Sequence, residues 1–147
     1  MRQNVKTFCL ILCLVIGTPI VCCVIPIMIP VAINQWTLWR FANNLFEYPL
    51  PPNTVVVEKT IELSHPGNGN TCLYQAKLIL ASTLSLETIK SYYANVEFPR
   101  VNDSPYASKS ITAWVKLDNR TATASEKRFI VELEDFGSDV TLDIRCH

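Results

Sequence analysis

The sequence predicts an α+β protein in which an N-terminal transmembrane helix precedes a two-layer domain. This domain has an antiparallel-rich sheet of about five strands with one helix on one face. Residues 8–33 are 26 consecutive positions without a charged side chain. From Asn53 onward, apolar and polar residues alternate at the period of strands, interrupted by helical spacing over 86–95. The chain therefore divides into a cytoplasmic stub and transmembrane helix (1–33), a juxtamembrane helix and linker (34–52) and an extracytoplasmic domain (53–147).

The apolar segment 8–33 is long enough to cross a bilayer. As a helix it would extend about 39 Å, against a hydrocarbon core of about 30 Å. Pro19 lies in its middle and should kink the helix, because it removes one backbone hydrogen bond. A cleaved signal peptide is the main alternative, but its apolar core would be much shorter, and Pro30 makes a poor cleavage site after Ala32. The segment is therefore expected to remain as an uncleaved signal-anchor.

Basic residues near the ends of this segment predict its orientation. Arg2 and Lys6 precede it, whereas Arg40 is the only basic residue in the next 25 positions. The positive-inside rule then places the N-terminus in the cytoplasm and the C-terminal domain outside. The expected location is the cell membrane, with a single pass.

Residues 34–52 contain an amphipathic helix followed by a proline-rich linker. Its polar side chains recur every three or four residues and form one stripe of Thr37, Arg40, Asn44 and Glu47. Among the apolar residues, we expect the membrane-interface anchors to be Trp36, Trp39 and Phe41. Packing of this helix on the outer domain explains the pattern equally well. We expect a fragment beginning near Tyr48 to be soluble, folded and monomeric; packing of residues 36–46 on the domain would instead leave it with an exposed apolar patch.

The outer domain begins with two strands. Residues 55–63 are rich in Val, Ile and Thr, with one face formed by Val57, Lys59, Ile61 and Leu63. Residues 71–82 alternate cleanly, with one face formed by Cys72, Tyr74, Ala76, Leu78 and Leu80. The connection over 64–70 is dense in turn residues and contains Asn68-Gly69, a typical hairpin dipeptide.

A helix and three strands complete the expected ββαβββ order. Ser85 is a good N-cap for a helix that ends near Asn95 and buries Leu86, Ile89 and Tyr93. Residues 111–117 alternate as a strand. The last two strands, 129–134 and 139–146, are expected to form a hairpin across Asp135-Phe136-Gly137-Ser138.

Composition excludes several classes of protein. With 13 basic and 13 acidic residues, the formal net charge is zero, which argues against a nucleic-acid partner. Only one segment is long and apolar enough to span a membrane, so a multispanning transporter is excluded. The expected partners are the lipid bilayer and an unknown protein or ligand at the outer membrane face.

Several strings are similar to those of a group of bacterial proteins. They are Leu50-Pro51-Pro52 after the anchor, Gly67-Asn68-Gly69-Asn70 in the hairpin, and Leu84-Ser85-Leu86-Glu87 with Tyr92-Tyr93 in the helix. Together they resemble small, uncharacterised, single-pass bacterial membrane proteins with a short extracytoplasmic α+β domain. The resemblance implies location and architecture, and it assigns no activity to any residue.

The sequence contains no recognisable catalytic, cofactor or metal site. His65 lies in a turn and His147 ends the chain, so neither is expected beside a nucleophile. Asp135-Phe136-Gly137 matches a kinase tripeptide, but no other kinase motif is present. Glu132 and Glu134 are expected on the solvent face of a strand, without the convergence that calcium needs. We expect no enzyme activity and no cofactor.

Cys72 and Cys146 are the two cysteines of the outer domain. Both lie on apolar strand faces, which suits a shared core. A crossover through helix 86–95 would make their strands parallel and place the two cysteines at opposite ends of the sheet, beyond the roughly 7 Å that a disulfide allows between Cα atoms. A Cys72–Cys146 disulfide and two free cysteines therefore remain alternatives.

Three hypotheses for function follow. The leading one is a membrane-tethered extracytoplasmic module that binds an unknown protein or ligand. The second is an accessory subunit of a larger membrane complex, acting through the transmembrane helix. The third is a small extracytoplasmic enzyme.

Overall fold

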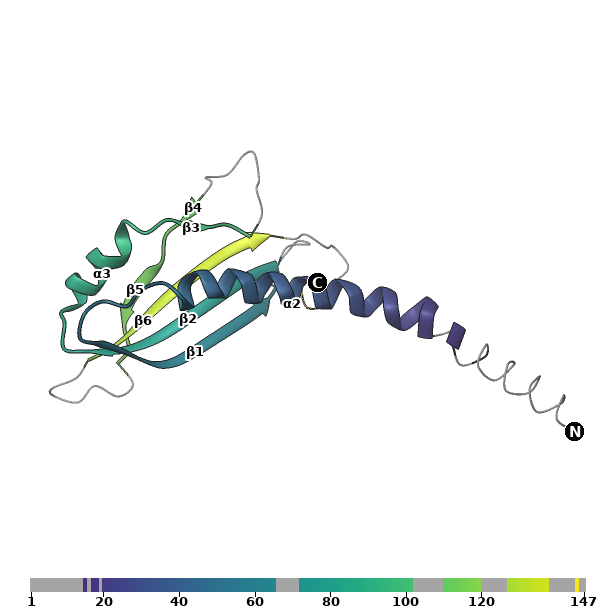
Figure 1. Cartoon of the computed structure of the whole chain (residues 1–147), viewed down its shortest axis with the longest axis horizontal. Helices are drawn as coiled ribbons and strands as arrows, with labels where there is room; N and C mark the ends of the chain where they lie inside the picture. Colours follow the sequence, from purple (N-terminus) through teal and green to yellow (C-terminus); the bar gives the residue numbers. More distant parts are fainter. Residues whose placement is uncertain are drawn as a thin grey trace, which may run out of the picture.

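The chain folds as an α+β structure with an antiparallel sheet and helices on one of its faces (Figure 1). The computed structural model describes residues 15, 17–18, 20–65, 72–101, 110–119, 127–137 and 145. In chain order the elements are η1 (Ile20–Val24, a π-helix), α2 (Ile25–Phe46), β1 (Thr54–Ser64), β2 (Cys72–Ser82), α3 (Leu86–Ala94), β3 (Phe98–Pro99), β4 (Ser110–Ile111), β5 (Trp114–Leu117) and β6 (Lys127–Gly137). The expected α+β class and its antiparallel sheet are confirmed.

The main sheet has four strands in the order β1-β2-β6-β5, and every neighbouring pair is antiparallel. Strand β6 pairs with β2 over its whole length, from Cys72 opposite Gly137 to Ser82 opposite Lys127. The expected turn at Asp135-Phe136-Gly137 is therefore wrong, because these residues continue β6. The expected final strand, 139–146, lies outside the described residues except for Arg145. The short pair β3–β4 forms a separate two-stranded sheet.

The hairpin of β1 and β2 and the faces of β2 agree with the alternation in the sequence. All five expected inward residues of β2 are completely buried: Cys72, Tyr74, Ala76, Leu78 and Leu80. In β1 the register shifts between Val56 and Glu58. This irregularity places Val56 against the core and exposes Val57. Strict alternation along the sequence predicts instead that Val57 shares a face with Ile61, which does pack on the core. The Asn68-Gly69 turn lies outside the described residues.

Helix α3 begins and packs as its sequence predicts. The Ser85 side chain accepts a hydrogen bond from the Thr88 backbone N–H, at 3.1 Å, which satisfies one donor of the first turn. Its buried face carries Ile89 and Tyr93, whereas Leu86, also expected to be buried, is only partly buried against the core. Neighbouring aromatic rings lie 5.2–6.1 Å apart between centroids and join α3 to the end of α2: Tyr48, Tyr92, Tyr93 and Phe98.

The two tyrosines of α3 give a matched pair of stability variants. The Tyr93 hydroxyl is buried without a hydrogen-bond partner among the described residues, and burial raises the pKa of this phenol. The Tyr92 hydroxyl donates to the Pro49 carbonyl oxygen at 3.0 Å. We expect Tyr93→Phe to leave the free energy of unfolding unchanged or raise it, and Tyr92→Phe to lower it by about 0.5–1.5 kcal/mol. Urea unfolding would measure both, and a larger loss for Tyr93→Phe would contradict this account.

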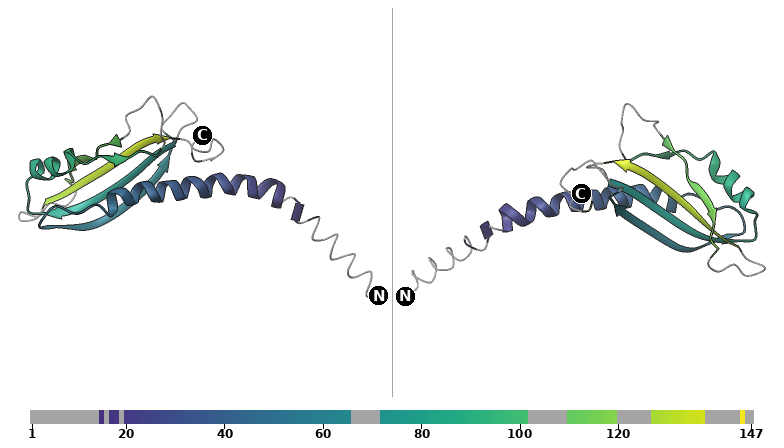
Figure 2. Two further views of the ribbon diagram at one scale, coloured as in Figure 1. Left: turned by 45° about the horizontal axis from the view of Figure 1, so that its top comes forward. Right: turned by 180° about the vertical axis from the view of Figure 1, so that it is seen from behind.

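Helix α2 is continuous through the boundary expected near residue 33, and its second half belongs to the core. Its buried side chains recur every three or four residues: Pro30, Asn34, Leu38, Phe41, Ala42 and Leu45. The last four belong to the same hydrophobic cluster as the inward residues of the sheet, and the helix contacts β1 and β2. The two views of Figure 2 show α2 lying along one face of the sheet and its N-terminal part extending past the strands. Of the two alternatives for residues 36–46, the structure has packing on the domain.

Candidate functional site

The N-terminal part of helix α2 and the turns before it expose apolar side chains that nothing in the described chain covers. We call the described residues between 15 and 33 the apolar arm. Eight of its large hydrophobic side chains are 42–65% exposed: Val15, Val21, Val24, Ile25, Ile27, Met28, Ile29 and Ile33. Within the described part of the chain, no helix is both long enough and apolar enough to span a membrane. The expected kink at Pro19 lies outside the described residues, and the π-helical turn η1 follows it.

The three expected interface anchors have different environments in the structure. Trp36 and Trp39 are 60% and 49% exposed, and their rings stack with centroids 5.4 Å apart. Phe41 is only 2% exposed and packs edge-to-face on Tyr74, at 6.3 Å. The placement of Phe41 at the membrane interface is therefore wrong, because its position on the helix points toward the sheet. The tryptophans lie on the outer side of the same helix.

A buried polar contact fixes α2 to the sheet where the apolar arm ends. Asn34 is completely buried. Its side-chain oxygen accepts a hydrogen bond from the Tyr74 hydroxyl at 3.1 Å, and its amide nitrogen lies 4.0 Å from the Cys72 sulfur. A buried amide is costly unless it is hydrogen-bonded, so these contacts fix the position of the helix along the sheet.

The C-terminal segment also contacts this part of α2. The Arg145 guanidinium donates to the Gln35 side-chain oxygen at 2.9 Å and to the Val31 carbonyl oxygen at 3.0 Å. Cys72 is disulfide-bonded. Cys22 is free. Because Cys146 follows Arg145 directly, and because β6 runs antiparallel to β2 and ends opposite Cys72, the topological argument against a Cys72–Cys146 disulfide no longer holds.

We therefore expect Cys72 to be joined to Cys146. Tryptic digestion of the unreduced protein should yield a linked peptide pair that contains both residues and disappears on reduction. Cys146→Ser should free Cys72 and lower the free energy of unfolding by about 2–5 kcal/mol. Linkage of Cys72 to Cys9, Cys13 or Cys23 instead would contradict the prediction.

The opposite face of the sheet carries a charged cluster centred on Glu132. This carboxylate accepts hydrogen bonds from Lys116 at 2.7 Å and Gln75 at 2.6 Å, and Lys77 lies 3.2 Å away. The face is the one expected for Glu132 from the alternation, but these neighbours leave the residue only 7% exposed. Burial opposes its ionisation, yet the hydrogen bonds and charges of Lys116 and Lys77 prevail, and the pKa of Glu132 is lowered. Trp114 lies opposite Glu132 on β5 and is 72% exposed.

The lowered pKa of Glu132 predicts how stability depends on pH. Because the folded-state pKa lies below the unfolded value, the contribution is complete above the ordinary glutamate pKa of 4.5 and is lost as the pH falls through the folded pKa. Glu132→Gln should cost about 1–2 kcal/mol near neutral pH and flatten the loss of stability below about pH 4.5. Urea unfolding across this range tests it. The control Glu87→Gln alters only a solvent-exposed pair with Lys90, and an equal flattening there would refute the assignment.

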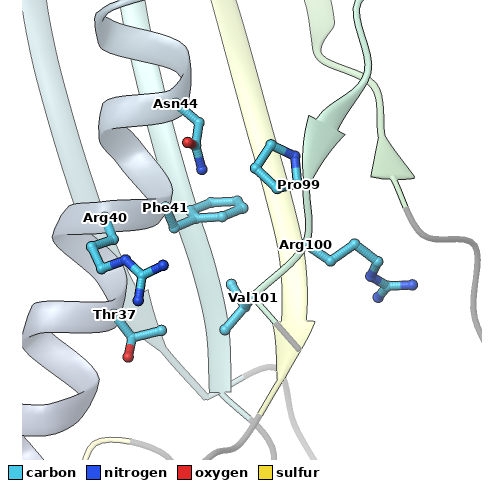
Figure 3. Close-up of a pocket in the computed structure, with 7 residues that line it drawn as sticks. All are labelled: Thr37, Arg40, Phe41, Asn44, Pro99, Arg100 and Val101. Carbon is cyan, nitrogen blue, oxygen red and sulfur yellow. The ribbon is translucent and has the colours of Figure 1, made fainter. Parts of the chain in front are cut away.

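A small polar pocket lies between α2 and the segment that follows β3 (Figure 3). It encloses about 160 Å³. Thr37, Arg40 and Asn44 form the helix side, and Pro99 and Val101 lie opposite (Figure 3). Arg100 also lines the pocket, but its guanidinium turns away and binds the buried Asp135 carboxylate. The helix side of the pocket is part of the polar stripe that the sequence predicts, whereas the opposite wall comes from a distant part of the chain and has no signal in the sequence.

The residues described by the structure show no group of three or more His, Cys, Asp or Glu side chains that could hold a metal ion. His65 is half-buried at the end of β1, and its Nδ1 atom has no hydrogen-bond partner among the described residues. His147 lies outside the described residues.

No family model, curated protein or solved structure matches the chain.

Proposed function

We propose that the chain is a membrane-tethered extracytoplasmic module, related in architecture to the single-pass bacterial proteins that it resembles. In this proposal residues 8–33 cross the bilayer, the N-terminus is cytoplasmic, and the sheet binds another protein or ligand close to the outer membrane face. The observation that carries the proposal is the apolar arm, because its side chains are exposed around the helix rather than along one stripe.

Exposure of the arm to water would be costly. Full burial of a Val, Leu, Ile or Met side chain contributes roughly 1.5–3 kcal/mol. Eight such side chains are each about half exposed, and burying their exposed parts would contribute on the order of 10 kcal/mol of free energy. A lipid environment recovers this free energy without demanding a complementary protein surface. The stacked pair Trp36–Trp39 follows the arm, where an interfacial aromatic belt would lie.

The continuity of α2 would hold the sheet in a fixed orientation relative to the membrane-crossing helix. The helix leaves the arm and enters the core without a flexible linker. The sheet face opposite the helices carries Trp114 and Phe136, which are 72% and 55% exposed. Large exposed aromatic side chains are common at protein interfaces. This face is therefore the proposed contact surface for a partner.

Membrane extraction and protease accessibility test the anchoring and its orientation. We expect the full chain to stay in the membrane pellet after alkaline carbonate washing, and its C-terminal domain to be digested by protease added to spheroplasts. Introducing charges with Ile27→Arg and Ile29→Arg should release the chain, whereas Lys90→Gln on α3 should not. Release of the wild-type chain would refute the anchoring, and a protected domain would refute the orientation.

Affinity purification tests the contact surface. A partner that copurifies with the full chain should be lost with Trp114→Ser and kept when Trp39→Ser is introduced instead. A partner kept by Trp114→Ser but lost when the arm is replaced by an unrelated transmembrane helix would favour the alternative, an accessory subunit acting through the transmembrane helix.

A further inference from the structure

The polar pocket beside α2 is lined by a positively charged side chain that the described part of the protein does not neutralise. Arg40 is exposed on the pocket side of the helix, and it forms no ion pair among the described residues. The second arginine of the pocket, Arg100, is engaged by Asp135, whose side-chain oxygen lies 3.2 Å from its Nε atom. The pocket therefore carries one net positive charge that is available to a ligand.

The other polar groups of the pocket suit an anionic ligand. The Thr37 hydroxyl and the Asn44 amide are neutral hydrogen-bond donors on the turns that flank Arg40, and no carboxylate lines the pocket. A guanidinium binds phosphate and carboxylate oxygens through paired hydrogen bonds. The volume of about 160 Å³ equals that of about five water molecules. This space fits a phosphate-sized group and is too small for a drug-sized ligand, which needs at least about 300 Å³.

The position of the pocket along α2 identifies the source of such a group. Arg40 follows Trp36 by four residues, which is about 6 Å along a helix axis. If Trp36 and Trp39 lie in the outer aromatic belt, the pocket lies at the depth of the lipid headgroups. We propose that the pocket binds the phosphate group of an anionic phospholipid headgroup, with Arg40 as its charged partner. This inference rests on the proposed membrane anchoring.

Such binding would attach the domain to the bilayer at a second point. One wall of the pocket is α2, and the other is the segment after β3, which the Arg100–Asp135 ion pair fastens to the sheet. A headgroup held between them would restrict the tilt of the sheet relative to the membrane. The anchoring helix alone would not fix this tilt.

Native mass spectrometry of the full chain, released from detergent with added lipid, tests the proposal. We expect the chain to retain phosphatidylglycerol more strongly than phosphatidylcholine. Arg40→Gln should weaken phosphatidylglycerol binding about tenfold or more, and Arg40→Lys should weaken it less. The control Lys90→Gln removes an exposed cation on α3 and should leave binding unchanged. Unfolding midpoints should be equal for all variants, since Arg40 has no structural partner among the described residues.

Two results would overturn the inference. If Arg40→Gln binds phosphatidylglycerol as well as the wild type does, the pocket is not a headgroup site. If the wild type retains phosphatidylglycerol no more strongly than phosphatidylcholine but binds inorganic phosphate, and Arg40→Gln does not bind it, the site recognises free phosphate, and the lipid source is wrong. Carbonate extraction of the same variants keeps the two proposals separate, because a chain that remains in the membrane without an Arg40-dependent lipid preference refutes only this inference.

Discussion

A fragment that begins at Tyr48 is expected to aggregate, in contrast to the soluble, folded fragment that the sequence predicts. Removing residues 1–47 deletes the side chains of α2 that cover the sheet, including Leu38, Phe41 and Leu45, which are at most 2% exposed. Burial of three large apolar side chains contributes roughly 5–9 kcal/mol. That is comparable with the whole free energy of unfolding of a small domain, about 5–15 kcal/mol. The uncovered surface of β2 would also form a large apolar patch.

Size-exclusion chromatography, dye binding and thermal melting measured by circular dichroism would test this expectation. The matched control is a fragment beginning at Val31, which discards most of the apolar arm but keeps every buried residue of α2 except Pro30. We expect this longer fragment to be monomeric with a cooperative melt. A monomeric, cooperatively melting fragment from Tyr48 would contradict the structure, because it would mean that α2 contributes little to the core.

Single substitutions on α2 distinguish the side chains that pack in the core from those on the outer side of the helix. Phe41→Ala should lower the free energy of unfolding by about 3–5 kcal/mol, because it leaves a cavity against Tyr74. Trp39→Ala removes a larger side chain from the outer side of the same helix. Among the described residues, the only aromatic ring in contact with Trp39 is that of Trp36. We expect its effect on the isolated domain to be below about 1 kcal/mol.

The strands could be predicted from the sequence because their signal is local. In β2 the alternation from Cys72 to Leu80 reports burial directly, since successive side chains of a strand point to opposite faces. The same holds for the start of α3, where Ser85 caps the helix within four residues. The departure at Val57 comes from a register shift against β2, and a single strand carries no information about its partner's register.

The packing of α2 could not be predicted from the sequence for a different reason. An apolar stripe such as Leu38, Phe41 and Leu45 is equally suited to lipid and to a sheet, and the pattern does not say which it meets. The pocket wall at Val101 depends likewise on contacts between distant segments. The residues over Asp135-Phe136-Gly137 favour a turn by local propensity, but pairing with β2 and binding of Arg100 hold them in a strand.

The ion pair between Asp135 and Arg100 carries the second large expected effect. Asp135 is 2% exposed, and its carboxylate accepts hydrogen bonds from the Arg100 guanidinium and from two backbone N–H groups, those of Val101 at 2.8 Å and Phe136 at 2.9 Å. The carboxylate is also the reason that the pKa of Arg100 is raised, mainly through this hydrogen bond. Asp135→Ala should lower the free energy of unfolding by about 3–5 kcal/mol, because it removes the buried half of an ion pair and leaves Arg100, whose side chain is only 17% exposed, and two backbone N–H groups without their acceptor. The melting temperature should fall on the order of 20 °C.

Variants of Asp135 and of its partner Arg100 show how much each contact contributes to this loss of stability. Asp135→Asn keeps an oxygen acceptor and should cost less than Asp135→Ala, whereas Arg100→Ala leaves the carboxylate with its two backbone donors and should also cost less. The double variant should then be less destabilised than the sum of the single changes, since each removes the same contact. Glu97→Ala, at an exposed position on the same segment, is the control and should change stability by less than about 0.5 kcal/mol. Additive losses in the double variant would show that the pair does not act as a unit, and the strand conformation of Asp135 would then need another cause.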